Sequence, residues 1–266
     1  MNRMYFFLLF LLAIVPPAFG DDAYPVVDHP DLEALFAEQN VAGAFVLLDP
    51  VTGAVHAVNP SRIEERRIPA STFKIANSLI ALETGAVRDE DEVIPYGGEP
   101  QPIKAWERDM DMREAIRVSN VPVFQELANR IGGEAYAEWL KRFDYGNRAT
   151  ADNAKAFWLR GPLAISPQEQ IAFVARLAAG TLPASQENQD TVRDMLLIER
   201  RGPASLYGKS GWSVSAEPQI GWWVGWVEKD GAAFVFALTI DMEGRKDADK
   251  REILMRALLK ELGVYG

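Results

Sequence analysis

The sequence contains no cysteine in its 266 residues, which excludes disulfide bonds, thiolate metal ligands and cysteine-linked lipid anchors. Histidine is almost as scarce, because only His29 and His56 occur. Two isolated histidines leave little from which to build a zinc site, and we interpret both as structural. A serine nucleophile activated by histidine is therefore disfavoured, so a serine enzyme with this sequence needs another base.

Long apolar runs are also missing after the first residues. Residues 5–15 are apolar and uncharged, but this run is too short to cross a bilayer. It follows Arg3 and precedes small residues up to Gly20, which is the pattern of a secretory signal peptide. We expect residues 1–20 to be cleaved, leaving residues 21–266 as one mature domain without membrane attachment. An uncleaved membrane anchor is the competing interpretation.

Basic residues are fewer than acidic ones, 28 against 38, so the formal net charge is −10. Such an acidic surface argues against nucleic acid or an anionic membrane as the partner. It does not argue against a small anionic substrate, because an acidic protein can contain a local cationic pocket. An exported protein without disulfides must rely on its core, and this favours a bacterial periplasm as its location.

The apolar pattern predicts strands near both ends of the chain and helices in the middle. We therefore expect an α/β fold of the α+β type, with a mixed antiparallel sheet built from both termini and an inserted helical lobe at roughly residues 85–200. Two lobes form a cleft, where a site is expected. The predicted strands are 42–48, 54–58, 205–209, 219–228 and 233–241, and the predicted helices are 31–39, several within 112–142, 166–177, 189–199 and 247–262.

The chain is organised around residues 69–82, which read as a helix that ends before Gly85. Apolar residues occupy nearly every face of this helix, which is typical of a buried helix. Its first turn carries Ser71 and Lys74, whose spacing of three residues places both side chains on one face. A lysine in apolar surroundings favours its neutral form, and a neutral amine can activate a serine hydroxyl. The alternative is an N-capping serine followed by a surface lysine.

Three more short motifs follow in order, namely Ser119-Asn120-Val121, Tyr145-Gly146-Asn147 and Lys209-Ser210-Gly211. With the S-x-x-K pair, this order resembles the class D serine β-lactamases, or oxacillinases. Residues 157–167, which include a tryptophan, and residues 104–109 also resemble segments of that family. The resemblance covers nearly the whole mature chain and implies the fold shared by serine β-lactamases and penicillin-binding transpeptidases.

The resemblance implies a set of catalytic roles. Ser71 attacks the β-lactam carbonyl, and Lys74, N-carboxylated by carbon dioxide, serves as the base for acylation and hydrolysis. Ser119 relays a proton to the leaving nitrogen, and Val121 forms an apolar wall. Trp158 offers its indole N–H to the carbamate, which as a buried anion needs donors. Taken without the resemblance, Trp158 and Val121 would be read as core residues.

The same resemblance implies the substrate-binding residues. Lys209 supplies positive charge, and the backbone N–H groups of Ser71 and Trp212 are expected to form the oxyanion hole. The substrate carboxylate needs a cation nearby, for which Arg251 is preferred over its neighbour Lys250. The other predicted site residues are Ser210, Gly211, Trp106, Tyr145 and Asn147, and for the last two a purely structural loop is an equal alternative.

Two other functions share the nucleophile. A penicillin-binding peptidase would use it on peptidoglycan, and a β-lactam-sensing domain would be acylated without efficient turnover. Trp158 and Val121 argue against the peptidase, and a sensor needs membrane spans that this sequence lacks. A class C β-lactamase typically has a much longer chain. We expect a small-molecule β-lactam as the partner, no metal, and no cofactor beyond carbon dioxide or bicarbonate, while the choice between monomer and homodimer stays open.

Overall fold

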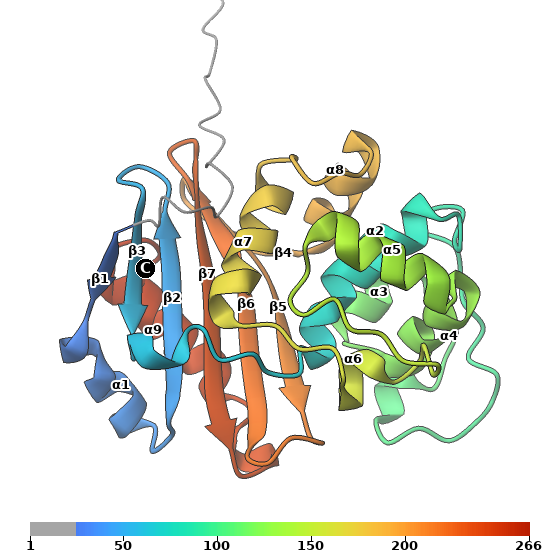
Figure 1. The fold of residues 1–266 in the computed structure, drawn as a ribbon, viewed down its shortest axis with the longest axis horizontal. Helices are drawn as coiled ribbons and strands as arrows, with labels where there is room; N and C mark the ends of the chain where they lie inside the picture. The colour runs from blue at the N-terminus through green and yellow to red at the C-terminus, as the bar shows by residue number, and fades with distance from the viewer. Residues whose placement is uncertain (1–24) are drawn as a thin grey trace, which may run out of the picture.

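The computed structural model describes residues 25–266, so the predicted signal peptide at 1–20 lies outside the described residues. One seven-stranded sheet runs in the order β1-β3-β2-β7-β6-β5-β4 (Figure 1). All neighbouring strands are antiparallel except β1 and β3, which confirms the predicted mixed sheet built from both ends of the chain. The strands are β1 (Val26–Asp28), β2 (Gly43–Asp49), β3 (Ala54–Val58), β4 (Leu197–Arg201), β5 (Ala204–Ser213), β6 (Gln219–Lys229) and β7 (Ala232–Met242).

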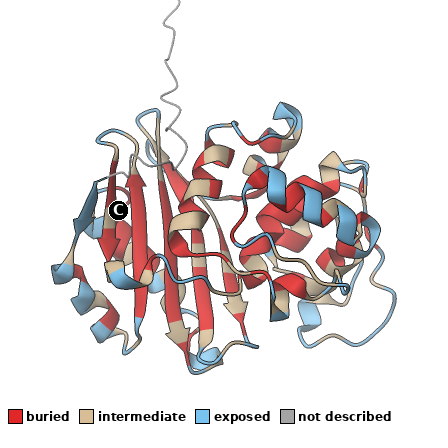
Figure 2. Cartoon of the chain, in the orientation of Figure 1, coloured by how far each residue is buried: buried red, intermediate tan, exposed pale blue. Residues whose placement is uncertain are grey.

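Successive side chains of the central strands point to opposite faces of the sheet. Each face is covered by an apolar core. In β2, Phe45 and Leu47 belong to one apolar core, together with residues of α1 (Glu33–Glu38) and α9 (Lys250–Glu261). Val46 belongs to the second and larger core on the opposite face. Figure 2 shows the central strands buried along most of their length between these layers.

A helical lobe lies beside the sheet, and α2 (Lys74–Glu83) is its central helix (Figure 1). Eight of the ten residues of α2 are buried, from Lys74 to Ala81, as expected for a helix that is apolar on nearly every face. The helix α7 (Pro167–Ala178) instead packs on β2, β6 and β7, so the predicted lobe at 85–200 includes one helix that covers the sheet. The other helices of the lobe are α3 (Met112–Arg117), α4 (Val121–Ile131), α5 (Gly133–Phe143), α6 (Phe157–Arg160) and α8 (Gln186–Met195).

The helix predicted at residues 189–199 is wrong in its last part. The helix α8 ends at Met195, and β4 follows as an edge strand that pairs with β5 through a tight hairpin. Pairing with β5 outweighs the helical preference of this segment, in which Leu197, Glu199 and Arg200 are good helix formers. Within residues 25–266, no helix is long and apolar enough to span a bilayer.

Candidate active site

The turn that carries Ser71 is the first part of the site. The predicted helix at 69–82 begins as a 3-10 turn, η3 (Ala70–Phe73), and α2 starts only at Lys74. Ala70 has a φ of 48°, a left-handed conformation that is unfavourable for a residue with a side chain. The strand β5 passes close to this turn at Gly211, where an added Cβ would lie 3.1 Å from the Pro69 carbonyl oxygen.

Lys74 lies directly beside the nucleophile candidate, with its Nζ 2.8 Å from the Ser71 Oγ. The lysine side chain is fully buried, and this burial, followed by the charge of Lys209, holds its pKa well below the ordinary value. Its Nζ lies 5.3 Å from the ring centre of Phe124 and 5.0 Å from that of Trp158. A neutral amine in these surroundings can accept the hydroxyl proton of Ser71.

Trp158 supplies an unused donor next to this amine. It lies on the short helix α6 and is fully buried. Its indole Nε1 finds no hydrogen-bond partner in the part of the chain that the structure describes. A buried donor without a partner is costly, so a site of this kind favours an added acceptor beside Lys74.

The Ser119 motif forms the turn between α3 and α4. Ser119 itself has a φ of 55°, and Asn120 caps α4 by accepting a hydrogen bond from the Val123 backbone N–H at 3.0 Å. Val121 is the first residue of α4 and packs partly buried against the large core. Trp106 is attached to the same turn, because its Nε1 donates to the Val118 carbonyl at 3.1 Å.

Lys209 and Arg251 add the cationic part of the site. Lys209 on β5 is buried, and burial together with the nearby charge of Arg251 lowers its pKa to about 7. Its Nζ donates to the Ser210 carbonyl at 3.0 Å. Arg251 reaches the same strand from α9, because its Nη1 donates to the Gly211 carbonyl at 2.6 Å. The strand also carries Trp212, whose Nε1 donates to Gln219 at 2.8 Å.

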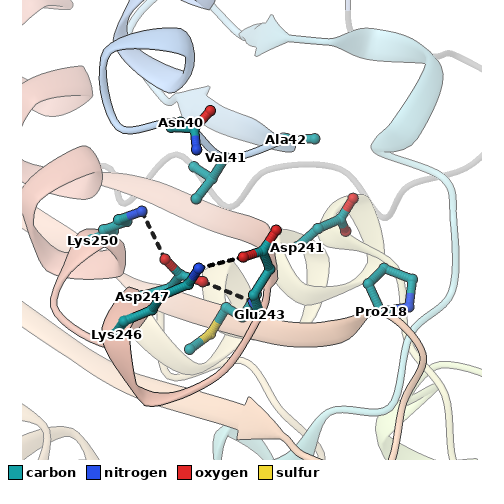
Figure 3. A pocket seen from close by; sticks show the side chains of 10 residues that line it. Asn40, Val41, Ala42, Pro218, Asp241, Glu243, Lys246, Asp247 and Lys250 are labelled. Atoms are coloured by element: carbon teal, nitrogen blue, oxygen red, sulfur yellow. Dashed lines mark hydrogen bonds and ion pairs between the residues drawn. The ribbon is translucent and has the colours of Figure 1, made fainter.

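Lys250, the alternative to Arg251, points elsewhere. Its Nζ pairs with the buried carboxylate of Asp247 at 2.7 Å, on the border of a pocket of about 220 Å³ (Figure 3). Since Arg251 contacts β5 and Lys250 contacts Asp247, the geometry favours Arg251 as the cation beside Lys209.

The Tyr145-Gly146-Asn147 motif lies in the framework around the site. Tyr145 is fully buried and contacts the Phe73 ring edge-on at 5.6 Å, so a substrate cannot touch it in this structure. Gly146 is needed, because a Cβ there would lie 2.2 Å from the Ala164 carbonyl oxygen. The Asn147 side chain donates to the Pro162 carbonyl at 2.8 Å and accepts from the Ala164 N–H at 3.0 Å. These contacts favour the structural alternative for the motif.

Sequence reasoning missed two residues of the site. Phe124 lies one helical turn after the Ser119 motif, and no signal distinguishes it from an ordinary core residue. Gln170 follows the capping box of α7 and is buried, which the polarity of glutamine does not predict.

Within residues 25–266, no group of three or more His, Cys, Asp or Glu side chains is arranged to hold a metal ion. The two histidines instead contact each other at the edge of the sheet, with His29 Nε2 2.8 Å from His56 Nδ1.

The sequence is similar to those of known proteins. A family model described as the penicillin binding protein transpeptidase domain matches residues 43–260. The chain is 39% identical to the β-lactamase OXA-48 of Klebsiella pneumoniae, over 88% of both chains. It is 36% identical to the β-lactamase OXA-10 of Pseudomonas aeruginosa, over 87% of this chain and 88% of that protein.

Solved structures give the same result. The class D β-lactamase FUS-1 (OXA-85) of Fusobacterium nucleatum superposes with a TM-score of 0.87 at 35% identity, covering 90% of this chain and 100% of the other. The class D β-lactamase YbXI of Nostoc superposes with a TM-score of 0.86 at 36% identity, covering 89% of this chain and 100% of the other.

Proposed function

This chain belongs to the class D β-lactamases, and we propose that it hydrolyses β-lactam antibiotics through an acyl-enzyme on Ser71. The observation that carries the proposal is the 2.8 Å contact between the Ser71 Oγ and the Nζ of a fully buried lysine. No histidine is close to this serine in sequence, and the two histidines contact each other instead. Lys74 is therefore the base that the site offers.

The proposed reaction has two stages. In the first, Ser71 transfers its proton toward the Lys74 position while its Oγ attacks the lactam carbonyl carbon. The C–N bond then breaks, and Ser119 relays the proton from the base to the leaving nitrogen, which frees the base again. In the second stage, water gives a proton to the same base and attacks the ester carbonyl carbon. The bond to the Ser71 Oγ then breaks, and the base returns the proton to this oxygen. The backbone N–H groups of Ser71 and Trp212 would stabilise both oxyanions, by about 3 kcal/mol for each donor.

We further propose that Lys74 is N-carboxylated, because its surroundings suit this modification. Carbon dioxide reacts only with a neutral amine, and burial lowers the Lys74 pKa. The added carboxylate would supply an anionic base at this position. Trp158 would donate its indole N–H, which has no other partner among the residues described, and the rings of Phe124 and Trp158 would limit the access of water.

Steady-state hydrolysis of a panel of penicillins, oxacillin and a carbapenem tests the proposed function. We expect sustained turnover by the wild-type protein and none by Ser71→Ala. A single stoichiometric burst would instead indicate a β-lactam sensor or penicillin-binding function. The same panel also defines the substrate range.

Isotope-labelled bicarbonate tests the modification. We expect a carbamate carbon signal that Lys74→Ala abolishes, together with activity that falls in acid and returns with bicarbonate. Trp158→Ala should slow deacylation more than acylation, because it removes a donor to the carbamate. Absence of the signal, together with activity that does not respond to bicarbonate, would exclude the carbamate.

The location follows from the predicted signal peptide. We propose export to the periplasm with cleavage after Gly20, which leaves Asp21 as the first residue. The intact mass of the protein recovered from the periplasmic fraction checks this, and a mass that includes residues 1–20 would favour the membrane anchor.

A further inference from the structure

A group of buried polar side chains holds the turn at residues 69–73 that carries Ser71. Thr72 follows Ser71 directly, and its Oγ1 donates to the Pro69 carbonyl at 2.8 Å. The same oxygen accepts a hydrogen bond from Gln170 Nε2 at 2.9 Å. The backbone N–H of Thr72 also donates to the Pro69 carbonyl, at 3.2 Å. Ser71 therefore lies inside a loop of chain whose two ends are bonded to each other.

The hydrogen bonds of Thr72 and Gln170 are buried. Thr72 and Gln170 are each 1% exposed, so neither can exchange its partner for water. Gln170 lies on α7, which is anchored by the capping box between Ser166 and Glu169 and packs on the sheet. The turn that presents Ser71 is thus bonded to a helix outside its own segment, and that helix packs on the central strands of the sheet.

The turn needs such a tie because it is strained. Ala70 adopts a φ of 48° beside the nucleophile, and a residue with a side chain keeps this conformation only when its surroundings enforce it. On its other side, the turn is held by β5 at Gly211. Loss of the bonds to Pro69 would let the segment relax toward ordinary helical geometry.

A third side chain completes the group. The Tyr145 hydroxyl is buried beside Thr72 and Gln170, and burial raises its pKa, so it remains a protonated donor. Neither this hydroxyl nor Gln170 Oε1 has a hydrogen-bond partner among residues 25–266. One group is a donor and the other an acceptor, so the two are complementary.

We propose that Gln170 and Thr72 are positioning residues, which hold the strained turn so that the Ser71 Oγ stays in line with the Lys74 Nζ. Tyr145 lies beside the same pair and packs against Phe73, which places the Tyr145-Gly146-Asn147 motif next to the turn that carries Ser71. The inference rests on the proposed acylation of Ser71. All three side chains are buried, so we place their effect on the geometry of attack and not on contact with the substrate.

Single-turnover kinetics with a chromogenic cephalosporin in saturating bicarbonate test the proposal. Thr72→Val and Gln170→Leu keep the approximate volume but remove the polar bond. We expect the acylation rate constant to fall about 10- to 100-fold, because small displacements of a nucleophile have effects of this size. The dissociation constant of the non-covalent complex and the bicarbonate dependence should stay within about two-fold, since the substrate contacts and Lys74 are unchanged.

Two control variants separate positioning from a loss of stability. Thr72→Ser restores the hydroxyl and should acylate within about three-fold of the wild-type rate. Tyr136→Phe removes another buried hydroxyl, which donates to Asn77 at 2.8 Å, on a ring that also packs against Phe73. It should lower the thermal midpoint but leave the acylation rate constant unchanged. The double variant of Thr72 and Gln170 should be no slower than the slower single variant.

Reaction of Ser71 with a phosphonate serine probe gives a second readout that needs no β-lactam. If the wild-type protein reacts with the probe but with no β-lactam, the proposed function fails while the positioning role is still measured. Folded Thr72→Val and Gln170→Leu proteins that react with both reagents at the wild-type rate would overturn the inference, as would equal rates for Thr72→Ser and Thr72→Val.

Discussion

Two buried lysines set the chemistry of the site at the scale of single residues. Lys74 and Lys209 both have lowered pKa values, and burial is the main cause for each. Their second influences differ, because Lys74 responds to the charge of Lys209, whereas Lys209 responds to Arg251. A neutral Lys74 suits a base, and a Lys209 that titrates near neutrality provides a cation whose charge depends on pH.

The pH dependence of substrate binding follows from Lys209. With a pKa of about 7, Lys209 is mostly charged at pH 6 and mostly neutral at pH 8. The charged form attracts the β-lactam carboxylate, so the dissociation constant should rise by up to about 10-fold between these pH values. Measurement of binding in the Ser71→Ala background checks this, because hydrolysis is then absent. Addition of Lys209→Met should flatten the profile, and a wild-type profile that is already flat would contradict the assignment.

At the scale of elements, the segment that carries Trp158 is held by several short contacts. Ile165 pairs with Arg67 in both directions at 2.9 Å, and the Leu163 N–H donates to the Phe157 carbonyl at 3.2 Å. The Asn147 side chain bonds to the same segment at Pro162 and Ala164. The position of Trp158 beside Lys74 therefore depends on residues that are outside the helix α6.

Asn147→Ala tests this dependence. The variant removes the bonds to the segment, and exposed bonds of this kind contribute about 1 kcal/mol each. We expect a modest loss of stability and a several-fold rise in the bicarbonate concentration that gives half-maximal activity. Asn153→Ala is the matched control, because the Asn153 side chain accepts from the Lys155 N–H within its own turn, at 3.0 Å, and makes no hydrogen bond with residues 162–164. An equal bicarbonate response in both variants would count against the dependence.

The sequence predicts elements well where local chemistry decides them. The strand at 54–58 has the predicted bounds, and a capping box between Ser166 and Glu169 opens α7 at the predicted start of the helix at 166–177. Pro122 stands in the first turn of α4, where its missing N–H and fixed φ suit a helix start. The edge strands β1 and β4 were not predictable in this way, because each is a short segment defined by its pairing with a neighbour.

The same division applies to the site. The S-x-x-K spacing predicts the contact between Ser71 and Lys74, since both residues lie one turn apart. The contact between Gln170 and Thr72 could not be predicted from the sequence, because the two residues are 98 positions apart and only the fold brings them together. A single sequence shows local spacing but not the registration of distant elements.

At the scale of the whole molecule, the buried charge of Lys209 lowers the free energy of unfolding. The sheet is packed on both faces by apolar cores, and Lys209 is buried on β5 beside the charge of Arg251. In the folded protein its pKa is about 7, against an ordinary value of 10.5. Below pH 7 both states hold the proton, so the folded state bears the full cost of a buried charge. From pH 7 to about 10.5 the unfolded state binds more protons, so this cost diminishes as the pH rises.

Lys209→Met should therefore stabilise the protein while abolishing its activity. We expect a gain of about 2 kcal/mol in the free energy of unfolding near pH 6, or roughly 5 °C in the thermal midpoint. The gain should shrink as the pH approaches 10, because the wild-type lysine is then neutral in the folded state. Thermal unfolding at both pH values checks this, with the exposed Lys260→Met as the control that changes little. A lower midpoint for Lys209→Met at pH 6, or a gain that does not depend on pH, would show that the buried charge is compensated within the fold.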